Sequence, residues 1–185
     1  MTEFAGFADH VKDVQEGNRA IKAGIIDDAL KLVEPNLNML RAHLENPRTL
    51  AKLHGCAPPL QEAVVFIIAG MMASKGERLF VASGVRSDRE QQALFAIGRD
   101  PKKPGKIVTH LDGIKRRSNH QVAVDGPWRG LGCAVDLVFL DEKGSPSWDE
   151  AYPWAFLGAL AKAQGLIWGG DWPTLRDRPH VELMS

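Results

Sequence analysis

One stretch in the second half of the chain constrains the fold more than any other. Residues 133–140 read Cys-Ala-Val-Asp-Leu-Val-Phe-Leu, a short apolar run with the length and the residue types of a buried strand. Asp136 is its only charged residue. An ionised carboxylate in such a strand costs several kcal/mol unless it is paired or binds a cation. The chain must therefore fold so that an arginine, a backbone cap or a metal ion reaches Asp136.

The size and charge of the chain suit one soluble domain with one core. It has 185 residues, of which 44% are hydrophobic, and this is enough apolar surface to exclude a disordered chain. The 23 basic and 23 acidic residues cancel, so no overall field favours nucleic acid or a membrane surface. We therefore expect neither nucleic-acid binding nor stable membrane insertion.

The hydrophobic pattern predicts an α+β domain. Residues 1–50 form a helical N-terminal extension, in which Pro35 divides a periodic run over residues 13–45, and residues 51–185 form the main domain. In the main domain we expect helices at 59–75, 90–97 and 154–164, strands at 79–82, 133–140 and 181–184, and a loop at 99–117.

Two further features bear on where the chain is made. The longest apolar run, residues 63–73, is about half of what a bilayer requires. The first residues lack the basic start and apolar stretch of a secretory signal, so we expect synthesis in the cytoplasm.

The two cysteines, Cys56 and Cys133, do not have metal-site spacing. We expect two thiols, or one disulfide if the protein reaches an oxidising compartment.

Two of the six histidines stand out by their surroundings. Asp177-Arg-Pro-His180 places a carboxylate three residues before a histidine, with Pro179 fixing the backbone between them. A hydrolytic zinc site needs three protein ligands, an open position and a nearby base. His120, His180 and Asp136 could be the ligands and Asp177 the base. The spacing alone does not exclude an arginine or a cap as the partner of Asp136.

Five groups of residues along the chain together resemble a known family. They match, in order, zinc peptidases of the M15 type, which have the D-alanyl-D-alanine carboxypeptidase or hedgehog-like fold, and most of all phage L-alanyl-D-glutamate endopeptidases that act as endolysins. The matching residues are Ser83-Gly-Val-Arg-Ser87 with Glu90-Gln91, Asp112-Gly113 with Ser118-Asn-His120-Gln121, Gly132-Cys-Ala-Val-Asp136-Leu, Trp168-Gly-Gly-Asp-Trp172, and Asp177-Arg-Pro-His180-Val-Glu182. The resemblance implies the fold of this family, with a small antiparallel sheet and flanking helices.

The resemblance implies a role for each matched residue. It makes the histidines and Asp136 the ligands of one zinc ion, Asp177 the general base, and Arg86 the group that stabilises the oxyanion. It implies that Gln91 and Ser118 support the site from behind. The residues expected to shape the substrate groove are Trp168, Asp171 and Trp172, although core packing explains the tryptophans equally well.

The chain departs from the family pattern between the first histidine and the aspartate. The family has H-x-x-G-x-A-x-D, whereas here residues 121–131 form an enlarged loop. An alternative alignment makes Asp125 the ligand, because Ser-Asn-His-Gln-Val-Ala-Val-Asp is also similar. We favour Asp136, because it lies in Gly-x-Ala-x-Asp at the start of a buried strand, whereas Asp125 precedes Gly126-Pro127 and suits a turn.

The resemblance also implies a substrate and a place of action. The expected substrate is a peptidoglycan stem peptide cut between L-Ala and D-Glu, and a phage or prophage endolysin without a signal peptide would reach the wall through a holin. A D,D-carboxypeptidase or dipeptidase would use the same site. A non-catalytic zinc-containing module for wall binding, or a scaffold protein, is the alternative from another class. Residues 1–50 would pack on the domain or assist wall binding.

Overall fold

The computed structural model of the protein describes residues 46–184. The predicted helical run at 13–45 and its break at Pro35 lie outside the described residues. Most of the predicted extension, residues 1–50, does so too. Within the described part a short helix, α4 (Pro47–Leu53), spans the predicted boundary at residues 50 and 51. The division into extension and domain therefore stays a prediction.

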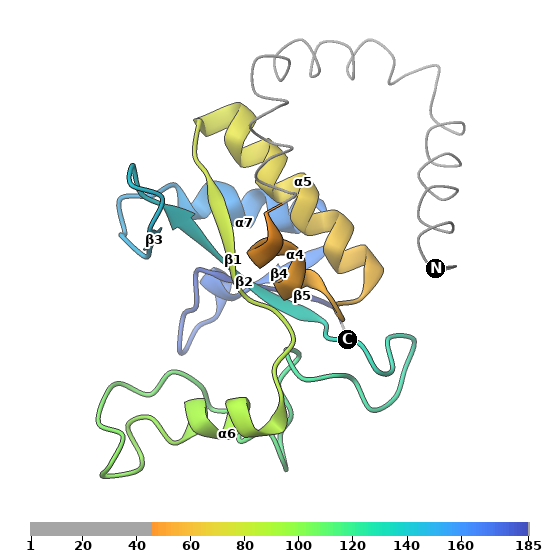
Figure 1. The fold of residues 1–185 in the computed structure, drawn as a ribbon, viewed down its shortest axis with the longest axis vertical. Coiled ribbons are helices and arrows are strands. Elements are labelled where there is room, and N and C mark those ends of the chain that lie inside the picture. The colour runs from red at the N-terminus through yellow and green to blue at the C-terminus, as the bar shows by residue number, and fades with distance from the viewer. Residues whose placement is uncertain (1–45, 185) are drawn as a thin grey trace. The chain divides into compact units, whose positions relative to one another are not determined.

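Two longer helices form one layer of the fold. They are α5 (Pro58–Lys75) and α7 (Trp154–Ala163), which pack together on one side of the sheet (Figure 1). Proline starts α5, where its missing N–H is not needed, and Gly76 ends it with a left-handed φ of 68°. Both helices lie within one residue of the predicted positions, and for α5 the prolines at its start and Gly76 after its end gave the bounds.

The sheet has four main strands in the order β1 (Leu79–Ser83), β2 (Ala134–Leu140), β5 (His180–Leu183) and β4 (Leu166–Trp168). The short β3 (Pro146–Ser147) pairs with the end of β2, and every pairing is antiparallel. The three predicted strands are confirmed to within one residue. Neither β3 nor β4 was predicted, because runs of two and three residues show no alternation that a sequence pattern can detect.

Strand alternation separates the core from the functional face. Val135, Leu137 and Phe139 of β2 are fully buried in the hydrophobic core, together with Val181 of β5. Because successive side chains of a strand point to opposite faces, Asp136 and His180 lie on the other face of the sheet. The core strand thus carries the carboxylate without placing it among the helices.

A lobe of the structure lies between β1 and His120. It begins with α6 (Asp88–Phe95), whose start is fixed by a capping box in which Ser87 and Glu90 bond each other's backbone N–H groups. This helix begins two residues before the predicted one. Residues 96–133 contain no helix or strand, as predicted for 99–117. Figure 1 shows α6 and the loop after it projecting from the sheet, away from α5 and α7.

Two expectations about the rest of the chain can be compared with the structure. Cys56 and Cys133 are both free thiols, and Cys56 is fully buried. Among the described residues, no helix is long and apolar enough to cross a membrane.

Candidate metal centre

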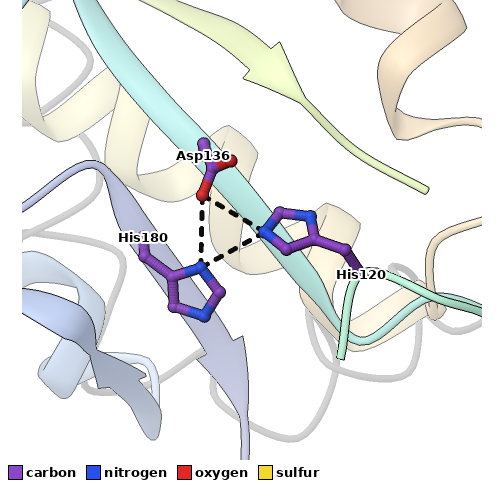
Figure 2. A group of neighbouring side chains, drawn as sticks. All are labelled: His120, Asp136 and His180. Carbon is purple, nitrogen blue, oxygen red and sulfur yellow. Dashed lines mark hydrogen bonds and ion pairs between the residues drawn. The ribbon is translucent and has the colours of Figure 1, made fainter. Parts of the chain in front are cut away.

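Three side chains from distant parts of the chain meet on the open face of the sheet. Asp136 and His180 lie opposite each other in the β2–β5 register, and His120 comes from the loop that precedes β2. Nε2 of His120 and Nδ1 of His180 each lie 3.2 Å from Oδ1 of Asp136, and the two nitrogens are 3.2 Å apart (Figure 2). The three ligand atoms therefore converge on one point.

The chemistry of this group fits a bound cation. Its three ligand atoms lie within 4.8 Å of one another, and two imidazole nitrogens with one carboxylate oxygen are a common zinc donor set. Nδ1 of His120 lies 2.8 Å from the carbonyl oxygen of Gly84. A carbonyl oxygen only accepts hydrogen bonds, so Nδ1 carries the proton of the neutral imidazole. Nε2 of His120 is then left with a free lone pair facing the other two ligands. Three such acceptors facing one another suit a metal ion.

The second histidine is oriented from behind by a carboxylate. Nε2 of His180 lies 3.0 Å from Oε2 of Glu182, and Nδ2 of Asn119 donates to the same oxygen at 3.0 Å. A carboxylate behind a metal-binding histidine fixes its tautomer and raises its basicity. The pair leaves Nδ1 of His180 free to face Asp136. Asn119 precedes His120, so this network also joins the two histidine-bearing segments.

Burial and charge oppose each other throughout the site. Burial alone would raise the pKa of Asp136, but His120, His180 and Arg86 outweigh it and hold that pKa well below its usual range. Burial likewise disfavours the charged form of His180, yet hydrogen bonds to Asp136 and Glu182 raise its pKa to about 9. The site thus holds an ionised carboxylate that attracts positive charge.

Arg86 holds the outer oxygen of Asp136. Its guanidinium forms an ion pair with Oδ2 of Asp136, and its Nε donates to Oγ of Ser83 at 2.9 Å. Its backbone N–H donates to the carbonyl oxygen of His120 at 2.8 Å, which ties the end of β1 to the first histidine. The ion pair leaves Oδ1 of Asp136 for the histidines. Arg86 is the arginine partner that the sequence allowed for Asp136, and it is present together with the histidines.

Asp177 lies beside the cluster and is half-buried. Burial raises its pKa above the usual value, and the negative charge of Asp136 adds to the increase. The backbone fixes its place, because its N–H donates to the Gly169 carbonyl at 2.9 Å and its own carbonyl accepts from the His180 N–H at 3.2 Å. A carboxylate with a raised pKa next to the metal ligands can take up and return a proton.

The four residues that were expected to surround the site do not all lie near it. Gln91 is 1% exposed and donates to the Leu111 carbonyl at 2.9 Å, and Ser118 accepts from the His120 N–H at 3.3 Å. The ring of Trp172 lies 4.9 Å from that of His180. Asp171 is exposed and pairs with Lys162 at 2.8 Å. Asp171 makes no described contact with the cluster, and the roles of all four residues stay predictions.

The alternative ligand Asp125 lies apart from this group. It is exposed on the enlarged loop, and among the described residues the only group of three that could hold a metal is His120, Asp136 and His180. Trp168 is nearly buried and donates to the Arg178 carbonyl at 2.7 Å, which favours a packing role.

Two supporting residues had no predicted role. Glu182 and Asn119 lie in the matched motifs, but the sequence reasoning assigned them no function. Glu182 could have been found from strand alternation, since it lies two residues after His180 and shares its face. No sequence signal pairs Asn119 with Glu182, because 63 residues separate them.

The chain is similar in sequence to a known family and to a characterised relative. Residues 113–183 match the M15 peptidase family described as D-alanyl-D-alanine carboxypeptidase. The peptidoglycan L-alanyl-D-glutamate endopeptidase CwlK of Bacillus subtilis is 32% identical over 120 residues, which cover 60% of this chain and 64% of CwlK. The chain thus spans less than two thirds of that relative.

One solved structure is also similar. It is the crystal structure of the L-Ala D-Glu endopeptidase ChiX of Serratia marcescens, with 25% sequence identity and a TM-score of 0.49. The match covers 76% of this chain and 95% of ChiX.

Proposed function

We propose that this protein is a zinc-dependent peptidase of bacterial peptidoglycan, because the part of the chain that carries the three candidate ligands matches the M15 peptidase family. One observation carries the proposal. Nε2 of His120, Oδ1 of Asp136 and Nδ1 of His180 converge within 4.8 Å, with the half-buried carboxylate of Asp177 beside them. This is the arrangement of three ligands and a base that metal-assisted hydrolysis requires.

The zinc ligands and Asp177 have different roles in the proposed reaction. A zinc ion held by His120, Asp136 and His180 would polarise the peptide carbonyl and lower the pKa of a water molecule. Asp177 accepts the proton of the attacking water and later donates it to the leaving amine. Its raised pKa suits both steps, because a carboxyl that binds its proton more firmly is a better base.

Arg86 stabilises the oxygen that becomes negative during the attack. A guanidinium has five N–H donors, and the described contacts of Arg86 engage only its Nε and Nη2. Nη1 makes no hydrogen bond to any residue in the described part of the chain. It is available to donate to the developing oxyanion, while the ion pair with Asp136 keeps the guanidinium in place.

We assign the scissile bond as the one between L-Ala and D-Glu of the stem peptide. The support is the 32% identity to CwlK, whose name states this specificity. The family description points to the alternative of D,D-carboxypeptidase activity, which would use the same ligands and base. The two activities release products of different mass.

We further propose that the protein is a phage or prophage endolysin. On this proposal it is made in the cytoplasm, is released through a holin and acts at the wall. The support is the resemblance of its motifs to phage endopeptidases. Expression in a bacterium with and without a co-expressed holin tests it, since lysis should require both proteins.

Metal content and digestion of purified peptidoglycan, measured on the wild type and on His180→Ala, test the enzymatic proposal. We expect one zinc per wild-type chain and product masses that locate the cut at L-Ala–D-Glu. Loss of both in the variant supports the site. Product masses that show removal of a terminal D-Ala would replace the assigned bond by the D,D-bond. A wild type that binds no metal and digests nothing would refute the proposal and favour a binding or scaffold role.

A further inference from the structure

One exposed loop carries a local excess of positive charge. Residues 99–117, hereafter the basic loop, contain seven of the 23 basic and two of the 23 acidic side chains. The whole chain has no net charge, so the rest of it carries the opposite excess. Residues 101–108, Pro-Lys-Lys-Pro-Gly-Lys-Ile-Val, are all exposed. The loop is therefore a local cationic surface on a neutral protein.

The two acidic residues of the basic loop do not neutralise its lysines. Oδ1 of Asp100 accepts from the backbone N–H of Lys102 at 2.9 Å. Oδ1 of Asp112 accepts from the backbone N–H groups of residues 114, 115 and 116 at 2.8–3.0 Å. Both carboxylates cap turns of the loop. Each is bonded to the backbone, and no ion pair with a lysine of the loop is present in the described part of the chain.

Six of the seven cations of the basic loop divide into two sets, and the seventh, Arg117, forms an ion pair with Asp88 at 3.2 Å. Arg99 and Arg116 hold the loop together by donating to backbone carbonyl groups, and Arg99 also lies over the ring of Phe95. The second set has no side-chain partner among the described residues. It consists of four exposed lysines: Lys102, Lys103, Lys106 and Lys115. The arginines thus order a loop that presents uncompensated lysines to solvent.

The position of the basic loop links it to the candidate metal centre. The lobe that contains it begins just after Arg86 and ends at His120, and the Arg86 N–H donates to the His120 carbonyl at 2.8 Å. Figure 1 shows this lobe projecting away from α5 and α7. A large ligand that contacts the loop would therefore lie against the segment of chain that leads to His120.

The substrate assigned above has the complementary charge. A glutamate residue has two carboxyl groups and the peptide chain uses one, so each L-Ala–D-Glu bond lies beside a carboxylate wherever that group is not amidated. A cross-linked wall repeats this charge at every stem peptide. Many weak contacts to a repeating polyanion combine into firm attachment.

We propose that the basic loop is a docking surface for the carboxylate-bearing peptidoglycan lattice, separate from the site that cuts the bond. This inference rests on the proposed function. An anionic membrane is the competing partner, since Ile107, Val108 and Ile114 of the loop are 39%, 47% and 68% exposed. Segments that lie on membranes usually present an apolar helix face, and the basic loop contains no helix. The lattice is therefore the partner that its structure favours.

Two triple variants of equal charge separate the effect of this surface from that of net charge. The loop variant is Lys102→Glu/Lys103→Glu/Lys106→Glu. The control variant reverses three exposed lysines outside the loop and is Lys52→Glu/Lys75→Glu/Lys143→Glu. Each full-length, zinc-loaded protein is tested for co-sedimentation with intact peptidoglycan sacculi, for the rate of sacculus digestion, and for hydrolysis of a short soluble L-Ala–D-Glu peptide.

The loop variant should bind sacculi about three- to hundredfold more weakly than wild type, since one exposed ion pair contributes about 1.4- to fivefold in affinity and three are lost. Its KM on sacculi should rise accordingly, while hydrolysis of the soluble peptide stays unchanged. Wild-type binding should weaken with added salt, because the screening length is only about 10 Å at 0.1 M. The control variant should bind like the wild type.

Equal binding by the two variants would overturn the proposal. So would a loop variant that keeps its binding to sacculi but loses binding to vesicles of anionic phospholipid, since that result assigns the surface to a membrane. If the wild type cuts neither substrate, the proposed function fails. The co-sedimentation comparison still decides in that case whether the basic loop binds the lattice.

Discussion

The carboxylate of Glu182 should set the strength of metal binding although it is not a predicted ligand. Its Oε2 lies 3.0 Å from Nε2 of His180, and the two side chains are 17% and 7% exposed. A hydrogen bond between charged or polarised partners in such a place contributes about 1.5–3 kcal/mol. The substitution Glu182→Gln keeps an acceptor oxygen of the same shape but removes the charge that makes His180 more basic.

The expected loss of zinc affinity follows from that energy. A difference of about 1.5–3 kcal/mol is roughly a ten- to hundredfold change in affinity, the range seen when the partner of a metal-binding histidine is removed. For Glu182→Gln the loss of zinc affinity should be close to tenfold, the lower end of this range. Glu182→Ala should lie near the upper end, because it also leaves Nε2 of His180 and Nδ2 of Asn119 without their acceptor.

Competition with a chromophoric zinc chelator measures the affinity directly and does not depend on turnover. Replacing zinc by cobalt adds a spectroscopic readout, since a rotated His180 ring should change the ligand-field bands. The matched control is Glu142→Gln, which removes an exposed carboxylate from the turn between β2 and β3. If Glu182→Gln and Glu182→Ala both bind zinc within twofold of the control, the carboxylate does not support His180 and the reasoning is wrong.

Three further predictions follow from single contacts. Asp177→Asn should keep its zinc, but its kcat should fall about a hundred- to ten-thousandfold, which is the usual effect of removing a general base. The control Asp171→Asn changes an exposed carboxylate and should alter kcat little. Gly84→Ala would place a methyl group 1.7 Å from the Lys52 carbonyl oxygen. It should cost about 1–3 kcal/mol or more in urea denaturation, and unchanged stability would contradict the described packing. Burial raises the pKa of Cys56 to about 11, so this thiol should react with Ellman's reagent at pH 8 much more slowly in the native than in the unfolded protein. The same shift should reduce stability as the pH rises from about 9 to 11, since only the unfolded thiol ionises there; a rapid native reaction would mean that the site opens readily.

Much of the site could be predicted from the sequence because its chemistry is local. An aspartate in an otherwise apolar strand requires a partner, and the family resemblance joined it to the histidine of the D-x-x-H motif. Helix α5 was predicted from its proline start and the glycine after its end, and α7 from its amphipathic pattern. Strands β3 and β4 were missed because pairing with longer neighbours makes them strands, and the residues themselves show no pattern.

The sequence by itself determined which residue types are present and which of them need a partner. Only the tertiary structure decided which partners meet. The β2–β5 register sets Asp136 opposite His180, and the enlarged loop leaves Asp125 on the surface. Asn119 and Glu182 are 63 residues apart and meet only because the loop before β2 folds back to β5. A one-residue slip in that register would turn Asp136 to the other face, so the pairing of strands, which no local pattern specifies, fixes the site.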